Sequence, residues 1–100
     1  MRRAAKVDTT QAAIVDALCA AGWFVVKIRR PVDLLIAKLG FTMIVECKTP
    51  KARKKNGPVV REDKRQSEQR EFMRTWPGAK MYASDPVKAV EMAEFLRLPR

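Results

Sequence analysis

The chain has 100 residues, with 21 Lys or Arg, 11 Asp or Glu and no histidine, so its formal net charge is +10. This excess on one small domain predicts a polyanionic partner, with nucleic acid first and an anionic membrane surface second. The absence of histidine excludes imidazole acid–base catalysis, catalytic triads and histidine metal sites. Two cysteines are too few for a closed zinc site or a disulfide framework. We therefore expect one domain over residues 1–100, in a reducing cytoplasm, with no transmembrane helix and no signal peptide.

The first predicted element is a helix that ends before Gly22, a residue typical of the C′ position. Asp8 or Thr9 can cap its N-terminus. Apolar residues at helical spacing form its inward stripe, namely Ile14, Val15 and Leu18. Gln11 falls on the same stripe, where a polar amide needs a partner or a purpose.

Three apolar, β-branched runs follow, and each predicts a strand: residues 23–28, 33–38 and 42–48. Their short connections, one of them at Gly40, imply an antiparallel meander. The apolar signal then stops, and residues 49–65 are predicted to form a basic loop.

After this loop, Ser67 is predicted to cap a helix that ends near Thr75, before Pro77 and Gly78. Residues 79–83 read as a short strand, and Asp85-Pro86 supplies the cap and first residue of a last helix. The apolar residues of that helix are Val87, Val90, Met92, Ala93, Phe95 and Leu96. The predicted fold is α/β, of order α-β-β-β-α-β-α, with a mixed sheet flanked by helices. Four aromatic residues are expected in the core rather than as stacking platforms for bases: Trp23, Phe24, Trp76 and Phe95. Cys19 and Cys47 are expected there as small core residues.

Two carboxylates and an ammonium group are predicted to meet at one end of the sheet. A strand alternates its faces, so Glu46 and Lys48 point to one side and Cys47 to the other. The turn at Gly40 brings Asp33 back to this point, approximately opposite Cys47.

This grouping favours a hard divalent cation. Carboxylate oxygens suit Mg²⁺, which takes one or two carboxylates and completes its shell with water and substrate phosphate. Such a cation polarises a phosphodiester and lowers the pKa of a bound water. Lys48 can hold that water or offset charge in the transition state. The alternative is an exposed surface pair of Glu46 and Lys48, with Asp33 merely starting a strand.

With these residues, the chain resembles the PD-(D/E)xK nuclease superfamily, and within it the small stand-alone VRR-Nuc proteins encoded by phages. The likeness covers nearly the whole chain. The motifs that carry it are Ala5-Lys6-Val7-Asp8, Ala20-Ala21-Gly22, Val32-Asp33-Leu34-Leu35-Ile36, Ile44-Val45-Glu46-Cys47-Lys48, Gln69-Arg70-Glu71-Phe72 and Trp76-Pro77-Gly78. Val32 departs from the family's pattern, which usually has proline there, and Gln11 stands where many members have an acidic residue.

The resemblance implies a restriction-endonuclease-like core that uses Mg²⁺ or Mn²⁺ and no small-molecule cofactor. It implies that Asp33 and Glu46 bind the metal, together with the backbone carbonyl of Cys47, and that Lys48 serves the attacking water. Gln69 would lie beside the site as a further catalytic residue, and Gln11 would be auxiliary. It also implies a homodimer, and a location in the cytoplasm of a bacterial or phage-infected cell. Gln69 can equally be an exposed helix amide.

A set of cations near this site is expected to contact phosphates: Arg29, Arg30, Lys51, Arg53, Lys54, Lys55, Arg61, Lys64 and Arg65. The simpler interpretation is a solvated run of charge. We expect a metal-dependent endonuclease that hydrolyses DNA phosphodiester bonds and is selective for structure, by nicking or by resolving branched DNA. One alternative is a catalytically inactive nucleic-acid-binding module on the same fold. A basic adaptor for acidic proteins or membranes has less support.

Overall fold

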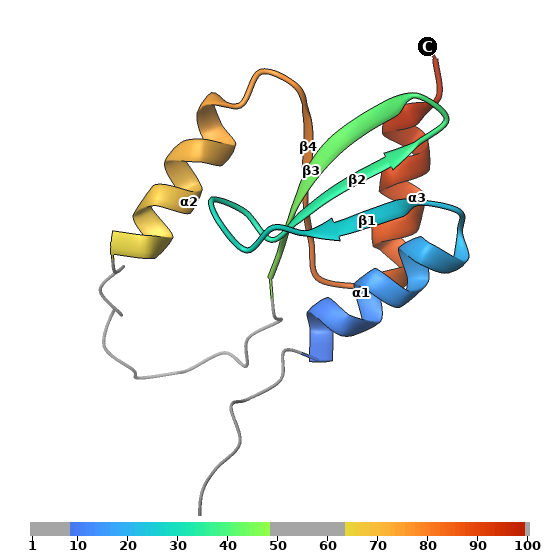
Figure 1. Cartoon of the computed structure of the whole chain (residues 1–100), viewed down its shortest axis with the longest axis horizontal. Coiled ribbons are helices and arrows are strands. Elements are labelled where there is room, and N and C mark those ends of the chain that lie inside the picture. The colour runs from blue at the N-terminus through green and yellow to red at the C-terminus, as the bar shows by residue number, and fades with distance from the viewer. Residues whose placement is uncertain (1–8, 49–63, 100) are drawn as a thin grey trace, which may run out of the picture.

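The computed structural model describes residues 9–48 and 64–99, and it has the predicted order of elements. The elements are α1 (Thr9–Ala20), β1 (Phe24–Lys27), β2 (Leu34–Lys38), β3 (Phe41–Cys47), α2 (Lys64–Thr75), β4 (Ala79–Ala83) and α3 (Pro86–Arg97). The predicted α-β-β-β-α-β-α fold with a mixed sheet and flanking helices is therefore confirmed (Figure 1).

The four strands form one sheet in the order β1-β2-β3-β4. The first three are antiparallel neighbours, as the short connections predicted. β4 lies parallel to β3, because the chain between them crosses back through α2. The sheet thus has two edges, β1 and β4, and β3 lies inside it.

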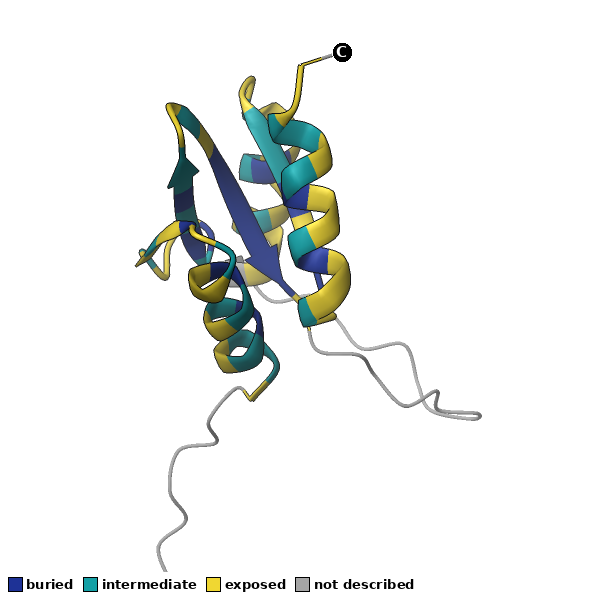
Figure 2. Ribbon diagram, turned by 90° about the vertical axis from the view of Figure 1, so that its right-hand side faces the viewer, coloured by how far each residue is buried: buried dark blue, intermediate teal, exposed yellow. Residues whose placement is uncertain are grey.

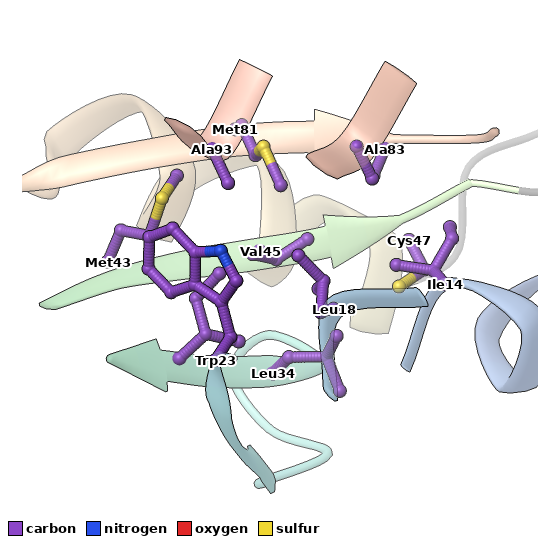
Figure 3. Close-up of a cluster of buried hydrophobic side chains, with 12 residues drawn as sticks. Ile14, Leu18, Trp23, Leu34, Met43, Val45, Cys47, Met81, Ala83 and Ala93 are labelled. Atoms are coloured by element: carbon purple, nitrogen blue, oxygen red, sulfur yellow. The ribbon is translucent and has the colours of Figure 1, made fainter. Parts of the chain in front are cut away.

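The sheet is covered on both faces, with α2 on one and the α1–α3 pair on the other (Figures 1 and 2). Its larger core lies on the α1–α3 face, where alternate strand residues meet the two helices (Figure 3). Ile14 and Leu18 of α1 are fully buried there, as the sequence predicted. Val15 is half-buried against the same cluster.

The helix ends follow the predicted signals. Gly22 has φ of 95°, the left-handed conformation that a C′ glycine adopts without strain. Asp85 caps α3 through a hydrogen bond from the Lys88 N–H to Oδ2 at 2.8 Å, and Pro86 is the first helical residue.

A smaller cluster joins α2 to the other face of the sheet. Its buried members are Val32, Ile44 and Met73. Lys80 of β4 strengthens this contact, because its Nζ donates to the carbonyls of Met73 at 2.7 Å and Trp76 at 2.9 Å, at the end of α2. α2 is therefore anchored at its C-terminal end by both packing and hydrogen bonds.

Three of the predicted core residues are exposed instead. The side chain of Phe24 is 70% exposed and that of Phe95 is 58% exposed. Phe24 points to the α2 face at the edge strand β1, beyond the small cluster that α2 covers, whereas α3 presents Ala89 and Ala93 to the core and turns Phe95 outward. Cys19 is also exposed. Trp23 and Cys47 are buried, and Trp76 packs partly buried against the small cluster, as predicted.

α2 begins earlier than the sequence predicted. Lys64 and Arg65 belong to the helix rather than to the preceding loop, and Ser67 lies inside the helix instead of capping it. The run from Lys64 to Gln66 contains good helix formers and neither glycine nor proline, so nothing in it delays the helix. Within the described ranges, no helix is long and apolar enough to cross a membrane.

Candidate metal and nucleic-acid site

Sheet register brings three polar side chains into one row across β2, β3 and β4. Leu34 pairs with Val45, so Asp33, directly before β2, lies opposite Glu46. Glu46 in turn pairs with Tyr82 of the parallel strand β4. By alternation all three face α2, while Leu34 and Val45 point into the larger core.

The sequence predicted that Asp33 lies approximately opposite Cys47, whereas in the structure it lies opposite Glu46, one residue away. The hairpin between β2 and β3 has Leu39 and Gly40 as its two turn residues, with φ of 50° and 84°. Positive φ at both positions is the signature of a type I′ turn. Because the turn is centred between Leu39 and Gly40 rather than on Gly40, the strand partners shift by one.

Hydrogen bonds lock Asp33 against the end of β3. The Asp33 N–H donates to Glu46 Oε1 at 3.2 Å, and Asp33 Oδ2 accepts from the Cys47 N–H at 2.9 Å. The side chain of Cys47 lies in the larger core beside Ile14 (Figure 3), so Cys47 offers only its backbone to the site. Both carboxylates are therefore fixed by the backbone of a neighbouring strand.

Glu46 is the one polar or charged residue that is fully buried among the residues described here, at 3% exposure. Burial raises the pKa of its carboxyl from the ordinary 4.5 to about 7; the neighbouring Asp33 carboxylate also raises it, and Lys48 opposes the rise. A buried carboxyl next to a second carboxyl is costly unless a positive charge compensates it. This pair is thus an electrostatic environment that a cation would stabilise.

Lys48 directly follows β3 and lies close enough to the carboxylates to lower the pKa of Glu46. The backbone N–H of Lys48 donates to the carbonyl of Ala83 at 2.7 Å, a bond that belongs to the last pair of the β3–β4 ladder, Cys47 with Ala83. Its Nζ lies 5.4 Å from the centroid of the Tyr82 ring, within cation–π range. The ammonium group is exposed to solvent, so a substrate can approach it.

Gln69 lies on the face of α2 that looks toward the sheet, one turn before Met73. α2 runs antiparallel to β3 (Figure 1). The path along β3 from Ile44 to Glu46 therefore goes in the same direction as the path back along α2 from Met73 to Gln69. Both paths are about 6 Å. The half-buried Gln69 therefore extends the sheet-facing side of α2 beyond Met73, toward the end of the sheet that carries Glu46.

The loop between β1 and β2 carries Arg29 and Arg30 to this end of the sheet, and both are exposed. Arg29 has φ of 70°, and the N–H groups of Ile28 and Arg29 both donate to the Asp33 carbonyl, at 2.9 and 3.2 Å. A long ion pair of 3.8 Å joins Arg30 to Glu68 of α2. The two arginines are therefore held near Asp33 and the first half of α2.

Gln11 lies in a different layer. It is half-buried in the first turn of α1, on the stripe that continues to Ile14 and Leu18. That stripe packs on the opposite face of the sheet from Glu46. Gln11 thus belongs to the helix layer whose Ile14 lies beside Cys47 at this end of β3, and its auxiliary role stays a prediction.

The remaining predicted phosphate contacts lie in or next to the part of the chain without a described structure. Lys51, Arg53, Lys54, Lys55 and Arg61 are outside the described residues. Lys64 and Arg65 form the start of α2, which carries them on the same element as Gln69.

The donor set of this site is small. In the two described segments, no group of three or more cysteine, aspartate or glutamate side chains could hold a metal ion. Asp33 and Glu46 supply two carboxylates, a number that suits Mg²⁺ because this ion keeps several waters and substrate phosphate oxygens in its shell. The residues present thus fit a hard cation shared with a substrate, and not a site closed by protein ligands.

Tyr82 is a member of this row that sequence reasoning missed. The buried residues Met81 and Ala83 on either side of it signal an outward side chain on β4. The sequence holds no signal, however, for the register of a parallel strand reached by a long crossover, so its place beside Glu46 emerges only from the sheet.

No protein-family model matches the chain, and no curated protein or solved structure matches it. The family resemblance therefore depends on the residues quoted above.

Proposed function

We propose that this protein is a metal-dependent nuclease that hydrolyses DNA phosphodiester bonds, as a member of the PD-(D/E)xK superfamily similar to VRR-Nuc proteins. One observation carries the proposal. The buried carboxyl of Glu46, with a pKa raised to about 7, lies beside Asp33 and Lys48 at one end of the sheet. A net charge of +10 on the chain supports a polyanionic substrate.

In this proposal, Asp33, Glu46 and the backbone carbonyl of Cys47 hold Mg²⁺ or Mn²⁺. The ion would supply positive charge for the scissile phosphate and a nucleophile at neutral pH. The protein's own part is to present the two carboxylates together, which the bonds between Asp33 and the end of β3 achieve.

Lys48 and Gln69 act around the reacting phosphate. The Lys48 ammonium group places positive charge where negative charge develops in the transition state, or orients the attacking water. Gln69, on the sheet-facing side of α2, offers an amide that can donate a hydrogen bond to substrate or water. Arg29 and Arg30, exposed on the adjoining loop, hold the phosphate backbone of the substrate.

The small fold favours recognition of DNA shape over sequence. Three helices and four strands build the part of the chain that the structure describes, and one site cuts one strand. Paired cuts, such as those that resolve a branched junction, then need two copies of the chain, so a homodimer is part of this proposal.

A panel of labelled single-stranded, duplex, flap and four-way DNA tests the proposal, each incubated with Mg²⁺, Mn²⁺ or EDTA. We expect cleavage only with metal, and a loss of about a hundredfold to a thousandfold in rate for Lys48→Ala, the range found when one group that stabilises a transition state is removed. Lys88→Ala is the matched control, because Lys88 is an exposed lysine of α3, on the other side of the sheet. It should cleave like the wild type.

The same panel separates the nuclease from an inactive binding module. Binding without metal, with a steep salt dependence and no cleavage of any substrate, would support the binding module. Equal cleavage by Lys48→Ala and Lys88→Ala would show that Lys48 has no catalytic part.

A further inference from the structure

A groove of about 490 Å³ lies between α2 and β4, next to the row of carboxylates. Its lining residues are Arg70, Met73, Arg74, Lys80, Met81 and Tyr82. β4 is an edge strand, so the groove is bounded by α2 on one side and follows the edge of the sheet. Its volume is within the range of about 300–1,000 Å³ that is usual for ligand pockets.

The lining of the groove combines apolar, aromatic and positively charged residues. Met73 and the ring of Tyr82 provide apolar and aromatic surface, whereas the side chain of Met81 points into the larger core. Arg70, Arg74 and Lys80 add three cations. The Nζ of Lys80 donates to the carbonyls of Met73, Arg74 and Trp76, and Glu71 offsets Arg74 through an ion pair of 2.6 Å. The groove is therefore positively charged around an apolar surface.

Tyr82 connects the groove to the candidate site. It pairs in register with Glu46, and its ring carries the Lys48 ammonium group at 5.4 Å. The ring is 52% exposed, so a ligand in the groove can contact it. A strand whose phosphate lies at Asp33 and Glu46 thus reaches the groove with its next nucleotide.

We infer that this groove binds an unpaired nucleotide of a nucleic-acid strand, adjacent to the phosphate held by the carboxylates. The inference rests on the proposed nuclease function and names the substrate feature that the site selects. An unpaired base exposes its face for stacking on an aromatic ring, while its phosphates bind nearby cations. A base inside a duplex is already stacked on its neighbours and presents only its edges.

Binding in EDTA tests the groove separately from cleavage. The probes are a fluorescein-labelled oligothymidylate of about 12 nucleotides and a blunt duplex of the same length. By fluorescence anisotropy we expect the wild type to prefer the single strand. Tyr82→Ala should weaken single-strand binding about tenfold, and Tyr82→Phe should keep wild-type affinity, because stacking needs the ring and not the hydroxyl. Duplex binding should be the same in all three proteins.

Lys27→Ala is the matched control, because it removes one exposed, positively charged side chain outside the groove. Lys27 lies on β1, at the far edge of the sheet. This variant should keep the preference for single strands. Three results would overturn the inference: no preference in the wild type, equal losses for both probes in Tyr82→Ala, or a Tyr82→Phe variant that behaves like Tyr82→Ala.

Cleavage measured in parallel with Mn²⁺ distinguishes failure of the groove from failure of the proposed function. Tyr82-dependent binding without any cleavage would retain the nucleotide groove and reject the nuclease. Cleavage with binding that does not depend on Tyr82 would retain the nuclease and reject the groove.

Discussion

Two hydrogen bonds between the start of β2 and the end of β3 fix the side chains of Asp33 and Glu46. The Asp33 N–H donates to the Glu46 carboxylate, and the Asp33 carboxylate accepts from the Cys47 N–H. Neither side chain can turn away without breaking a bond to the neighbouring strand. The sheet therefore holds two acidic groups together although their charges repel. The cost of this arrangement is visible in the pKa of the Glu46 carboxyl, which burial and the neighbouring Asp33 raise to about 7.

The first prediction concerns the pH dependence of stability without metal. The pKa of Glu46 is about 7 in the folded protein against 4.5 ordinarily, so the folded state binds this proton more tightly than the unfolded state does. Stability should therefore fall as pH rises from about 5 to about 8, by roughly 1–3 kcal/mol from this group. Urea unfolding in EDTA at several pH values measures the change.

Glu46→Gln isolates this contribution, because its amide has nearly the same shape and does not titrate. We expect the difference in unfolding free energy between the variant and the wild type to grow in favour of the variant above about pH 7. If the unfolding free energies of the two proteins changed in parallel with pH, the surroundings of Glu46 would not raise its pKa.

The second prediction concerns metal binding without catalysis. Mn²⁺ should raise the midpoint of thermal unfolding of the wild type, because an ion that binds only the folded state stabilises it by mass action. Asp33→Asn and Glu46→Gln should each lose most of this shift. Glu91→Gln is the control, since Glu91 is an exposed acid of α3, and it should keep the full shift. An equal shift in all four proteins would place the binding of Mn²⁺ elsewhere.

The third prediction assigns Gln69 a part in the site. Gln69→Ala should slow metal-dependent cleavage about tenfold, with little change in the midpoint of unfolding, because it removes a hydrogen-bonding amide from the sheet-facing side of α2. Gln66→Ala removes the same group from an exposed position one turn earlier in α2, and should cleave normally. Similar rates for both variants would identify Gln69 as an ordinary helix amide.

Much of this arrangement could be predicted from local sequence. The alternation in Glu46-Cys47-Lys48 predicted which side chains share a face, and Gly22 and the Asp85-Pro86 pair predicted two helix ends. These signals are short in range and act within one element or one turn. The hairpin between β2 and β3 belongs with them, because its two strands are neighbours in sequence.

What could not be predicted depends on contacts between distant segments. Tyr82 reaches Glu46 only through the parallel register of β3 and β4, which no residue nearby specifies. The exposure of Phe24 depends on how far α2 extends over the sheet, and that extent is set by Ile44, Val32 and Met73 packing together. Even the pairing of β2 with β3 differs by one residue from the predicted pairing. Leu39 adopts a positive φ, which is rare for an apolar residue, so the sequence does not signal the centre of this turn.

The last prediction concerns the side of the molecule away from the site, where Glu94 of α3 holds three elements together. Its carboxylate binds Lys38 at 2.6 Å and Arg97 at 2.8 Å, and it accepts from the Trp23 indole at 3.0 Å. The hydrogen bonds from Lys38 and Arg97 lower the pKa of Glu94 to about 2. A lowered pKa stabilises the fold above about pH 4.5, and this stabilisation is lost as pH falls toward 2.

Glu94→Gln should therefore destabilise the protein at neutral pH by about 1 kcal/mol, a modest value because the three side chains are only partly buried. The deficit should shrink on acidification, as the wild type loses the same contacts. Urea unfolding monitored by tryptophan fluorescence measures both effects. Glu71→Gln is the control, since the Glu71–Arg74 pair is exposed and within one helix, so its loss should leave unfolding unchanged. A Glu94→Gln variant as stable as this control would mean that the apolar packing of α3, through Ala89, Val90, Ala93 and Leu96, holds the helix on the sheet without the Glu94 contacts.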